Sequence, residues 1–500
     1  MFETIVNTLY GEVKGERIDG ISIWKGIPYA APPVGSLRFC PPNPPSSWDG
    51  IRDASKFGKS AMQPEKSTLI GDKSGTISED CLYLNIWSPN ADDKLRPVMV
   101  WIHGGGFIAG SGYDGIYDGT SFAKEGNVVI VTLNYRLGAF GFLYLKEIAG
   151  EKYSTSGNCG LLDQIAALKW VKENIKAFGG DPNKITIFGE SAGAASIGNL
   201  LAMPAAKGLF NQAIIESTTK LAINSATASK ATNKLINLLG IEKNEFEKLI
   251  ALPADKLVKA SLTFPMATFR PVIDNVSIPE DPEDLLRKGA AKNIPIICGS
   301  NKDEFALFSA ANPSFDQWDE KEILTSLEKQ FGTAWPELYK YFSKEKIDKK
   351  TYNRIMSYYS FIYPTLKYSE ILSTMSPVWV YKFSFEHPVL GAFHSSELQY
   401  VWNKNEVKNI NLFKIPPQGR KLAKQMHHAW IAFAHNGNPN ANEIPYWPGF
   451  EVKDRAVMVF NDESRVEYDP YEDRKIWEKI SERNTFDAKK ENRDVPFFNN

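Results

Sequence analysis

Hydrophobic residues in the first half of the chain follow two alternating patterns. Residues 98–102 (VMVWI) and 128–133 (VVIVTL) are unbroken apolar runs of strand length, as in parallel strands that are covered on both faces. Residues 163–178 place apolar side chains at helical spacing, and two glycines then mark a stop. A strand at 184–188 and a helix at 194–201 follow. This alternation predicts a doubly wound α/β core.

The second half of the chain continues the pattern with an interruption. Further strands are predicted at 294–298 and 378–383. Between them, residues 309–374 are rich in Lys and Glu with interspersed aromatic residues, which predicts helices. We interpret a region around 305–375 as a helical insertion that packs over the sheet and shapes a substrate entrance. The whole chain, 1–500, is predicted to form a single domain with this insertion.

The composition excludes several classes of protein. The chain has 500 residues, 43% of them hydrophobic, and 58 Lys and Arg balance 59 Asp and Glu. Disorder over most of the length is excluded. The net charge of -1 does not indicate binding to nucleic acid or to an anionic membrane, and it fits a small, weakly charged ligand. No apolar run reaches about 18 residues and the start does not resemble a signal peptide, so a cytoplasmic location is predicted.

The four cysteines do not form a recognisable metal or disulfide pattern. They are scattered along the chain without a C-x-x-C pair or zinc spacing. We expect free, buried thiols and no bound metal. The four are Cys40, Cys81, Cys159 and Cys298.

A candidate nucleophile lies between the strand at 184–188 and the helix at 194–201. The segment Gly189-Glu-Ser-Ala-Gly193 matches G-x-S-x-G. In this pattern a serine stands on a sharp strand-to-helix turn, and the flanking glycines avoid collisions with the neighbouring strand and helix. The helix N-terminus also favours negative charge nearby. Ser191 is therefore the predicted nucleophile.

A glycine-rich loop follows the strand at 98–102. The segment His103-Gly-Gly-Gly-Phe107 allows backbone N–H groups to approach a ligand closely. Attack on an ester carbonyl creates an oxyanion that needs two or three such donors. The predicted donors are the N–H groups of Gly105, Gly106 and Ala192, and His103 is expected to shape the loop.

A histidine is needed to transfer protons near neutral pH, and the chain has six. His427, His428 and His435 lie off the apolar stripe of a predicted helix, as expected for a solvated helix face or a core edge. His387 and His394 both follow the strand at 378–383, where a hydrolase base belongs. Spacing does not choose between these two.

The third catalytic member should be a carboxylate after a strand between the serine and the histidine. The loop after residues 294–298 offers Asp303 and Glu304. Either one could orient the imidazole and stabilise its cationic form.

Eight segments together resemble the type-B carboxylesterases, the carboxylesterase/cholinesterase family of α/β-hydrolases, and are most similar to bacterial para-nitrobenzyl esterases. The resemblance runs from about residue 5 to 480. The segments are 25–30 (KGIPYA), 79–85 (EDCLYLN), 103–107 (HGGGF), 134–138 (NYRLG), 178–182 (FGGDP), 189–193 (GESAG), Asp303-Glu304 and Gly391-x-x-His394-x-x-Glu397.

The resemblance implies an α/β-hydrolase fold and chooses among the candidates. It implies that Glu304 is the acid and His394 the base, and its oxyanion donors match Gly105, Gly106 and Ala192. Glu190 and Ser217 match positions whose side chains support the catalytic residues. We also expect Phe107 to border the acyl side of the pocket.

Two positions depart from the family pattern. Phe305 stands where the family usually has glycine after the acid, which would be strained if the backbone there had positive φ. Secreted relatives pair the Cys81 position with a cysteine about twenty residues earlier, but residues 60–63 here read Ser-Ala-Met-Gln. Cys81 is therefore expected to be unpaired, as in a reducing compartment.

The predicted function is hydrolysis of a small carboxylic ester by water through an acyl-enzyme, without a cofactor. The rate is expected to fall as His394 protonates near its ordinary pKa of ~6.5. Two alternatives are a non-catalytic, cholinesterase-like partner-binding protein and an amidase with the same fold. Acyl-chain preference is expected to depend on residues 62–78, 220–270 and 305–375, whereas the oligomeric state is not predicted.

Overall fold

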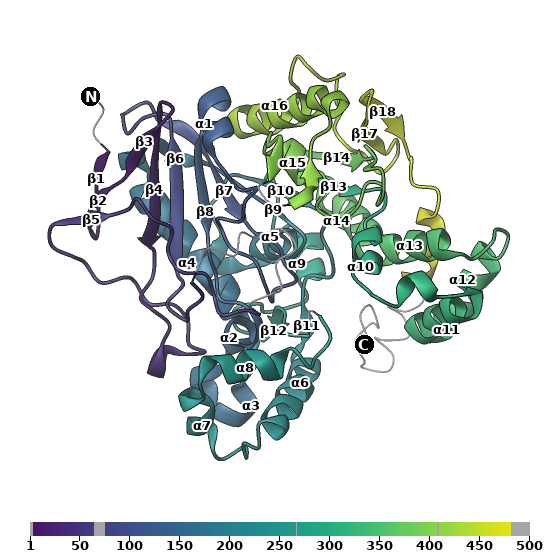
Figure 1. The fold of residues 1–500 in the computed structure, drawn as a ribbon, viewed down its shortest axis with the longest axis horizontal. Helices are drawn as coiled ribbons and strands as arrows, with labels where there is room; N and C mark the ends of the chain where they lie inside the picture. Colours follow the sequence, from purple (N-terminus) through teal and green to yellow (C-terminus); the bar gives the residue numbers. More distant parts are fainter. Residues whose placement is uncertain (1–3, 65–75, 267, 408–409, 482–500) are drawn as a thin grey trace.

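The computed structural model describes residues 4–64, 76–266, 268–407 and 410–481. An eleven-stranded sheet crosses the molecule (Figure 1) in the order β18-β17-β14-β13-β10-β9-β7-β8-β6-β4-β3. Its strands are β3 (Glu16–Ile18), β4 (Ile21–Pro28), β6 (Tyr83–Ser88), β7 (Arg96–Ile102), β8 (Val129–Leu133), β9 (Gly180–Glu190), β10 (Gln212–Glu216), β13 (Ile296–Asn301), β14 (Val378–Phe383), β17 (Ala456–Phe460) and β18 (Arg465–Tyr468).

The centre of this sheet is parallel, as the apolar runs predict. Strands β8, β7, β9, β10, β13, β14 and β17 pair in parallel with their neighbours. Pairing is antiparallel at the two edges, where β3, β4 and β6 lie on one side and β18 on the other. All five predicted strands are present, and β14 begins and ends where it was predicted.

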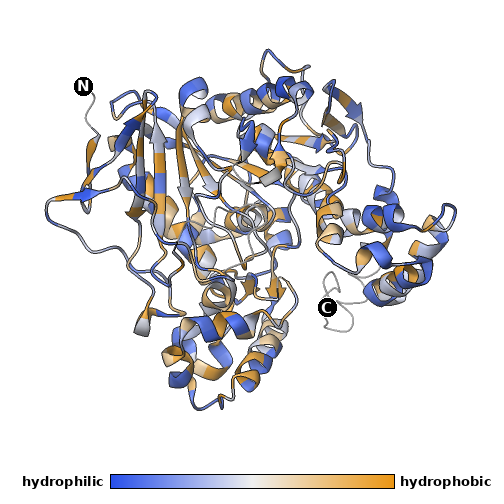
Figure 2. Cartoon of the chain, viewed as in Figure 1, coloured by the Kyte–Doolittle hydropathy of each residue, from blue (hydrophilic) through white to orange (hydrophobic). Residues whose placement is uncertain are grey.

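Both faces of the sheet are covered, which explains why its central strands are apolar throughout. In β7, Val98, Val100 and Ile102 belong to one hydrophobic cluster. Met99 and Trp101 point to the opposite face and belong to a second cluster. In Figure 2 the central strands are accordingly coloured as hydrophobic.

Different helices supply the two clusters. Helices α4 (Cys159–Asn174) and α5 (Ala192–Ala202), both predicted from the sequence, pack in the first cluster together with α14 (Tyr363–Ser373). Helices α1 (Thr120–Gly126) and α16 (Arg420–Asn436) pack in the second. The strands thus form the middle of a three-layer α/β arrangement.

The region between β13 and β14 is helical, as predicted, and most of it projects at the right of Figure 1. A π-helical turn at 358–362 joins α13 directly to α14. Residues of these helices, including Ile323 and Leu338, belong to the same hydrophobic cluster as the sheet. That the chain forms one domain with an insertion stays a prediction. The helices are α10 (Ala306–Ala310), α11 (Glu320–Phe331), α12 (Trp335–Phe342) and α13 (Lys349–Ser357).

Shorter elements complete the fold. Helices α3, α6, α7 and α8 gather below the sheet in Figure 1. The remaining helices are α2 (Gly138–Phe142), α3 (Lys146–Ala149), α6 (Ser225–Leu238), α7 (Phe246–Ala251), α8 (Ala254–Ser261), α9 (Pro282–Arg287) and α15 (Leu398–Val401). The remaining strands are β1 (Ile5–Thr8), β2 (Gly11–Lys14), β5 (Ile51–Asp53), β11 (Ile223–Asn224), β12 (Val272–Ile273), β15 (Glu406–Val407) and β16 (Ile410–Lys414).

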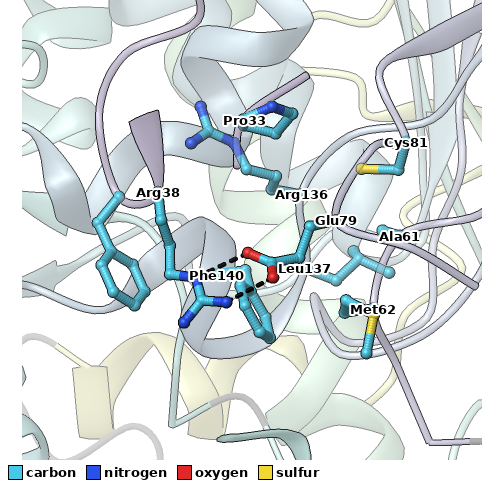
Figure 3. Close-up of a pocket in the computed structure, with 10 residues that line it drawn as sticks. Pro33, Arg38, Ala61, Met62, Glu79, Cys81, Arg136, Leu137 and Phe140 are labelled. Carbon is cyan, nitrogen blue, oxygen red and sulfur yellow. Dashed lines mark hydrogen bonds and ion pairs between the residues drawn. The ribbon is translucent and has the colours of Figure 1, made fainter. Parts of the chain in front are cut away.

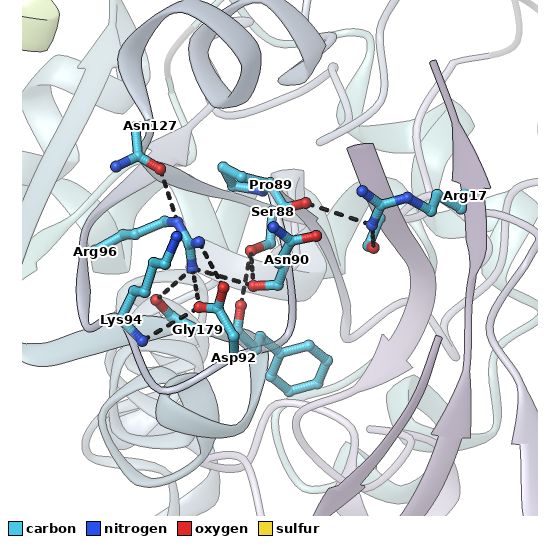
Figure 4. A network of polar contacts seen from close by, with 11 residues as sticks. Arg17, Ser88, Pro89, Asn90, Asp92, Lys94, Arg96, Asn127 and Gly179 are labelled. Atoms are coloured by element: carbon cyan, nitrogen blue, oxygen red, sulfur yellow. Dashed lines mark hydrogen bonds and ion pairs between the residues drawn. The ribbon is translucent and has the colours of Figure 1, made fainter. Parts of the chain in front are cut away.

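A buried arginine anchors the beginning of β7. The guanidinium of Arg96 donates to both carboxylate oxygens of Asp92, at 2.5 and 2.9 Å, and its Nε donates to Asn127 at 2.8 Å (Figure 4). The loop before β7 is thereby tied to the end of α1. This network stabilises the amino end of β7. Ligands of such sheets bind at the carboxyl ends of the strands, so the network lies away from the expected binding edge.

Candidate active site

Ser191 occupies a strained turn between β9 and α5. Its backbone has φ 56° and ψ −119°, a region that residues with a side chain rarely adopt. A Cβ on Gly189 would lie 2.5 Å from the carbonyl oxygen of Ile102, and one on Gly193 only 2.0 Å from it. Both glycines are therefore required by the close approach of β7, as the G-x-S-x-G pattern predicts.

The glycine-rich loop lies beside this serine. A Cβ on Gly104 would be 3.1 Å from the Cβ of Ser191. Gly105 and Gly106 have φ of 99° and 63°, and a Cβ on Gly105 would lie 2.1 Å from the carbonyl oxygen of Ala109. Among the described residues, no backbone acceptor pairs with the N–H groups of Gly105, Gly106 or Ala192. These N–H groups are free to bind an anion.

His103 supports the loop as the sequence suggests. Its ring is buried and stacks on Tyr135 with 4.4 Å between the ring centroids. Burial lowers the pKa of His103 to about 4, so the ring is neutral at neutral pH. Its Nδ1 lies 2.9 Å from the carbonyl oxygen of Gly104 and can donate to it. The same peptide carries the N–H of Gly105, so this contact orients that donor.

The structure brings His394 and Glu304 together. Nδ1 of His394 donates to Glu304 Oε2 over 2.6 Å, and both side chains are buried. The other oxygen of Glu304 accepts from the Ser217 hydroxyl at 2.6 Å and from the Asn301 N–H at 2.7 Å. Glu304 is thereby fixed in the orientation that contacts the imidazole.

The two residues that spacing left as alternatives have other partners. His387 pairs through its backbone with Gly391, and its Nδ1 accepts from the Val389 N–H at 3.3 Å. Asp303 accepts from the Ala392 N–H at 2.9 Å through Oδ2. Within the described part of the chain, neither side chain makes a hydrogen bond or ion pair with the side chain of His394 or Glu304.

The second ring nitrogen of His394 faces another carboxylate. Nε2 lies 3.0 Å from Glu190 Oε1 and makes this contact instead of one to the Ser191 hydroxyl. Since both ring nitrogens face carboxylate oxygens, both must carry protons. Burial alone would lower the pKa of His394, but the charges and hydrogen bonds of Glu190 and Glu304 raise it well above 6.5. The expected titration near 6.5 is therefore wrong, because it used the ordinary pKa of histidine and left out the combined effect of Glu190 and Glu304.

Two aromatic rings pack against the imidazole of His394. The rings of Phe361 and Phe308 lie 4.3 and 5.2 Å from the His394 ring, centroid to centroid. Phe308 belongs to α10, just after Phe305, whose φ is −80°. A glycine is thus not required at 305, and the departure there causes no backbone strain.

Two more buried glutamates, to which the sequence analysis assigned no role, lie near the site. Burial raises the pKa of Glu216 to about 8, although the Trp430 indole donates to it at 2.9 Å. Burial, followed by the charges of Glu190 and Glu304, raises the pKa of Glu397 well above its usual range. Glu397 also contacts the side chain of Asn301. The site therefore holds more carboxyl groups than one histidine can neutralise.

Comparison with known proteins decides the family. The sequence profile described as "Carboxylesterase family" matches residues 3–477. The chain belongs to this family. It is 39% identical over 483 residues, 94% of this chain and 97% of the relative, to a para-nitrobenzyl esterase of Bacillus subtilis (strain 168). It is 34% identical to a phenmedipham hydrolase of Pseudarthrobacter oxydans, covering 92% of this chain and 95% of that relative.

Solved carboxylesterases share the whole fold. The carboxylesterase EST55 of Geobacillus stearothermophilus superposes with a TM-score of 0.88 at 43% identity, covering 95% of this chain and 100% of that one. The predicted α/β-hydrolase fold and membership of the carboxylesterase family are confirmed. The protein is an enzyme that hydrolyses esters, with an ester and water as its substrates.

An apolar pocket, which is open to solvent and encloses about 740 Å³ of space, lies next to the glycine-rich loop of this esterase. Its wall includes Ile108, and Met266, which also lines it, lies 3.2 Å from where a Cβ on Gly106 would stand. Its described lining includes residues from two of the three segments expected to affect acyl-chain preference, 62–78 and 220–270, and none from 305–375. Residues 65–75 are outside the described part, and the expectation itself stays a prediction. Phe107 does not line this pocket and packs against Phe142 instead.

A narrow pocket, also open to solvent, borders the first and is lined by a largely buried ion pair (Figure 3). Arg38 donates to both carboxylate oxygens of Glu79, at 2.7 and 2.5 Å. Arg136 and Cys81 also line this cavity. Because its charged groups already pair with one another, this cavity offers less to a substrate than the apolar one.

The remaining histidines and the cysteines have structural surroundings. His427 is fully buried and its Nδ1 contacts the Val401 carbonyl at 2.8 Å, while His428 is partly exposed and contacts Glu443 at 2.9 Å. All four cysteines are buried free thiols, as predicted. In the part of the chain that the structure describes, no cluster of His, Cys, Asp and Glu could hold a metal ion and no helix could span a membrane.

Proposed function

We propose that Ser191, His394 and Glu304 form a catalytic triad that cleaves carboxylic esters through an acyl-enzyme intermediate. One observation carries this proposal. Glu304 holds His394 by Nδ1, while Nε2 of the same ring contacts Glu190, the residue next to Ser191. The proposed reaction requires Nε2 to leave Glu190 and to accept a hydrogen bond from the serine hydroxyl.

The proposed reaction has two halves. Neutral His394 takes the hydroxyl proton as Ser191 Oγ bonds to the ester carbonyl carbon, and it then gives this proton to the departing alcohol oxygen. In the second half, water replaces the alcohol, His394 takes its proton, and the acid is released as Ser191 recovers its own. Glu304 stabilises the cationic ring in each half.

Backbone donors would stabilise the oxyanion in both halves. The N–H groups of Gly105, Gly106 and Ala192 are the proposed donors, because they lie beside Ser191 without backbone acceptors of their own. Ala192 is the first residue of α5, so the positive end of the helix dipole adds to them. Removing one such donor typically costs about 3–4 kcal/mol in activation free energy.

The apolar cavity supports a class of substrate. Its lining residues carry no charged side chain, and methionine, leucine and phenylalanine side chains predominate. We therefore propose esters whose acyl or alcohol group is apolar and uncharged. A cytoplasmic location, which no described feature tests beyond the lack of a spanning helix, stays a prediction.

Replacing the nucleophile tests the triad. In Ser191→Ala, release of p-nitrophenol from an apolar p-nitrophenyl ester should fall at least ~10³-fold, since the covalent step is lost. The wild-type enzyme should also be inactivated by one equivalent of a phosphonate that bonds to Ser191, as read by mass spectrometry.

A matched variant controls for loss of a buried hydroxyl. Ser229 is buried in α6, and its hydroxyl has no partner among the described residues. Ser229→Ala should retain the wild-type rate. Full activity in Ser191→Ala with an unchanged Tm would overturn the proposed triad.

A further inference from the structure

Ser395 follows the proposed base and has an unusual backbone. Its φ is 68°, in the left-handed region that a residue with a side chain rarely adopts. The side chain is 2% exposed, and its hydroxyl donates to Glu190 Oε1 over 2.7 Å. A glycine would adopt this backbone without strain. The chain thus keeps a hydroxyl at a position where the backbone alone would favour its absence.

The oxygen that Ser395 contacts is the one that also contacts the base. Glu190 Oε1 accepts from the Ser395 hydroxyl at 2.7 Å and from His394 Nε2 at 3.0 Å. Two donors therefore share one carboxylate oxygen. A donor that stabilises the carboxylate reduces its attraction for a proton on a neighbouring group. The Ser395 hydroxyl thus competes with His394 for Glu190.

We propose that Ser395 is a positioning residue for ester hydrolysis, whose hydroxyl weakens the hold of Glu190 on His394 Nε2 and so lets the imidazole turn to Ser191. This inference rests on the proposed triad. Ser395 itself does not touch the substrate. Its effect is on how readily His394 loses the proton that Glu190 holds.

The surroundings of His394 make this competition consequential. Acidic groups face the cluster from four elements or their ends: Glu190 from β9, Glu216 from β10, Glu304 after β13 and Glu397 before α15. The rings of Phe308 and Phe361 pack against His394. The charge of Glu190 also acts on three buried tyrosines and contributes to raising their pKa: Tyr117, Tyr135 and Tyr381. The Ser395 hydroxyl is accordingly an uncharged donor to Glu190 in an acidic surrounding.

Two substitutions separate the hydroxyl from the backbone strain. Ser395→Ala removes the hydroxyl and keeps a Cβ in the left-handed region, whereas Ser395→Gly removes both the hydroxyl and the strain. In both variants the acid limb of kcat/KM against pH should move by about 0.5–1 unit toward alkaline pH, with the plateau retained. Ser395→Gly should have the higher Tm of the two.

A neighbouring serine supplies the matched control. Ser396 is also buried, and its hydroxyl has no partner among the described residues. Ser396→Ala should leave the acid limb where the wild-type protein has it. A change of similar size in Ser396→Ala would mean that any cavity nearby causes the shift, and would overturn the proposal.

A second readout avoids dependence on activity. The pH midpoint of the His394 ring resonances, followed by NMR in the inactive Ser191→Ala background, should rise by the same amount when Ser395→Ala or Ser395→Gly is added. An unshifted midpoint in both glycine and alanine variants, or a rate lowered equally at every pH, would overturn the role of Ser395. Failure of the triad itself would instead appear as activity in Ser191→Ala alone.

Discussion

Two buried ion-pair clusters in this esterase differ in their balance of charge. Arg136 and Asp163 are both buried, and the guanidinium donates to both carboxylate oxygens at 2.7 and 2.8 Å. The third guanidinium nitrogen, Nη1, donates to the Cys40 carbonyl at 2.8 Å, and the Arg136 backbone N–H donates to Asp163 Oδ2 at 3.0 Å. His394, by contrast, is one cation between Glu190 and Glu304.

The backbone differs between the clusters as well. Of the thirteen described non-glycine residues with positive φ, three, Ser191, Ser217 and Ser395, are or contact members of the His394 cluster. Neither Arg136 nor Asp163 has positive φ. Strained backbone persists only where the surrounding structure enforces it, and it concentrates at functional sites.

The contrast separates two uses of buried charge. A balanced pair with every lone pair satisfied holds segments together and does not titrate near neutral pH. In an unbalanced cluster, small changes in the surroundings can move a proton from one group to another. Such a cluster suits acid–base chemistry. The three predictions below test this contrast, beginning with the largest expected effect.

Substituting one carboxylate in each cluster should affect different properties: activity in the His394 cluster and stability in the Arg136–Asp163 pair. Glu304→Gln keeps the shape of the side chain but cannot stabilise the cationic His394, so kcat/KM should fall on the order of 10³–10⁴-fold with little change in Tm. Steady-state kinetics and thermal unfolding of the same preparation measure both quantities.

The matching change in the balanced pair is Asp163→Asn. It leaves the buried Arg136 without a counter-charge, which should lower the free energy of unfolding by about 3–5 kcal/mol. The rate per folded molecule should stay near that of the wild type. If Glu304→Gln unfolded the protein while Asp163→Asn abolished catalysis, the assignment of the two clusters would be reversed.

The glycine-rich loop, with its proposed oxyanion donors, offers a second test with a smaller effect. Gly105→Ala places a Cβ 2.1 Å from the Ala109 carbonyl oxygen and forces the loop to move. Loss of an aligned donor should lower kcat on the order of 10²–10³-fold. Gly208 also has positive φ, 79°, but a Cβ there meets nothing within 4 Å. Gly208→Ala should lower stability by about 1 kcal/mol and leave kcat unchanged.

The pH dependence of the wild-type enzyme is the third and smallest test. Because the folded pKa of His394 is raised above 6.5, the neutral base becomes available only as pH rises through that higher value. Below it, kcat/KM should fall about tenfold per pH unit. The stability from the pair is complete below pH ~6.5 and is lost as pH rises through the folded pKa. A rate already on its plateau at pH 6 would contradict a base held between two carboxylates.

Local sequence was sufficient for the elements and for the turn that carries the proposed nucleophile. The apolar runs predicted strands covered on both faces, and the two clusters around β7 explain why. The glycines around Ser191 predicted its turn correctly, because the close approach of Ile102 excludes side chains at their positions. Such requirements act within a few residues of the chain, so they leave a local pattern.

The choice of base and acid could not be made from spacing. His387 and His394 are seven positions apart after the same strand, and Asp303 and Glu304 are adjacent. Only the fold turns His394 and Glu304 toward each other, and only family resemblance anticipated that choice. Ser395 and Glu216 left no local signal at all, because their importance comes from partners that are distant in the chain.

The amino-acid sequence by itself determined the α/β core, the position of Ser191 on its turn and the family, since these depend on periodicity and on contiguous motifs. Tertiary structure alone decided that His394 lies between two carboxylates and that Phe305 fits without strain. The physical reason is that charge balance and burial are properties of residues brought together from separate segments. A proton at this site responds to the sum of those neighbours, and no single segment of the chain contains that sum.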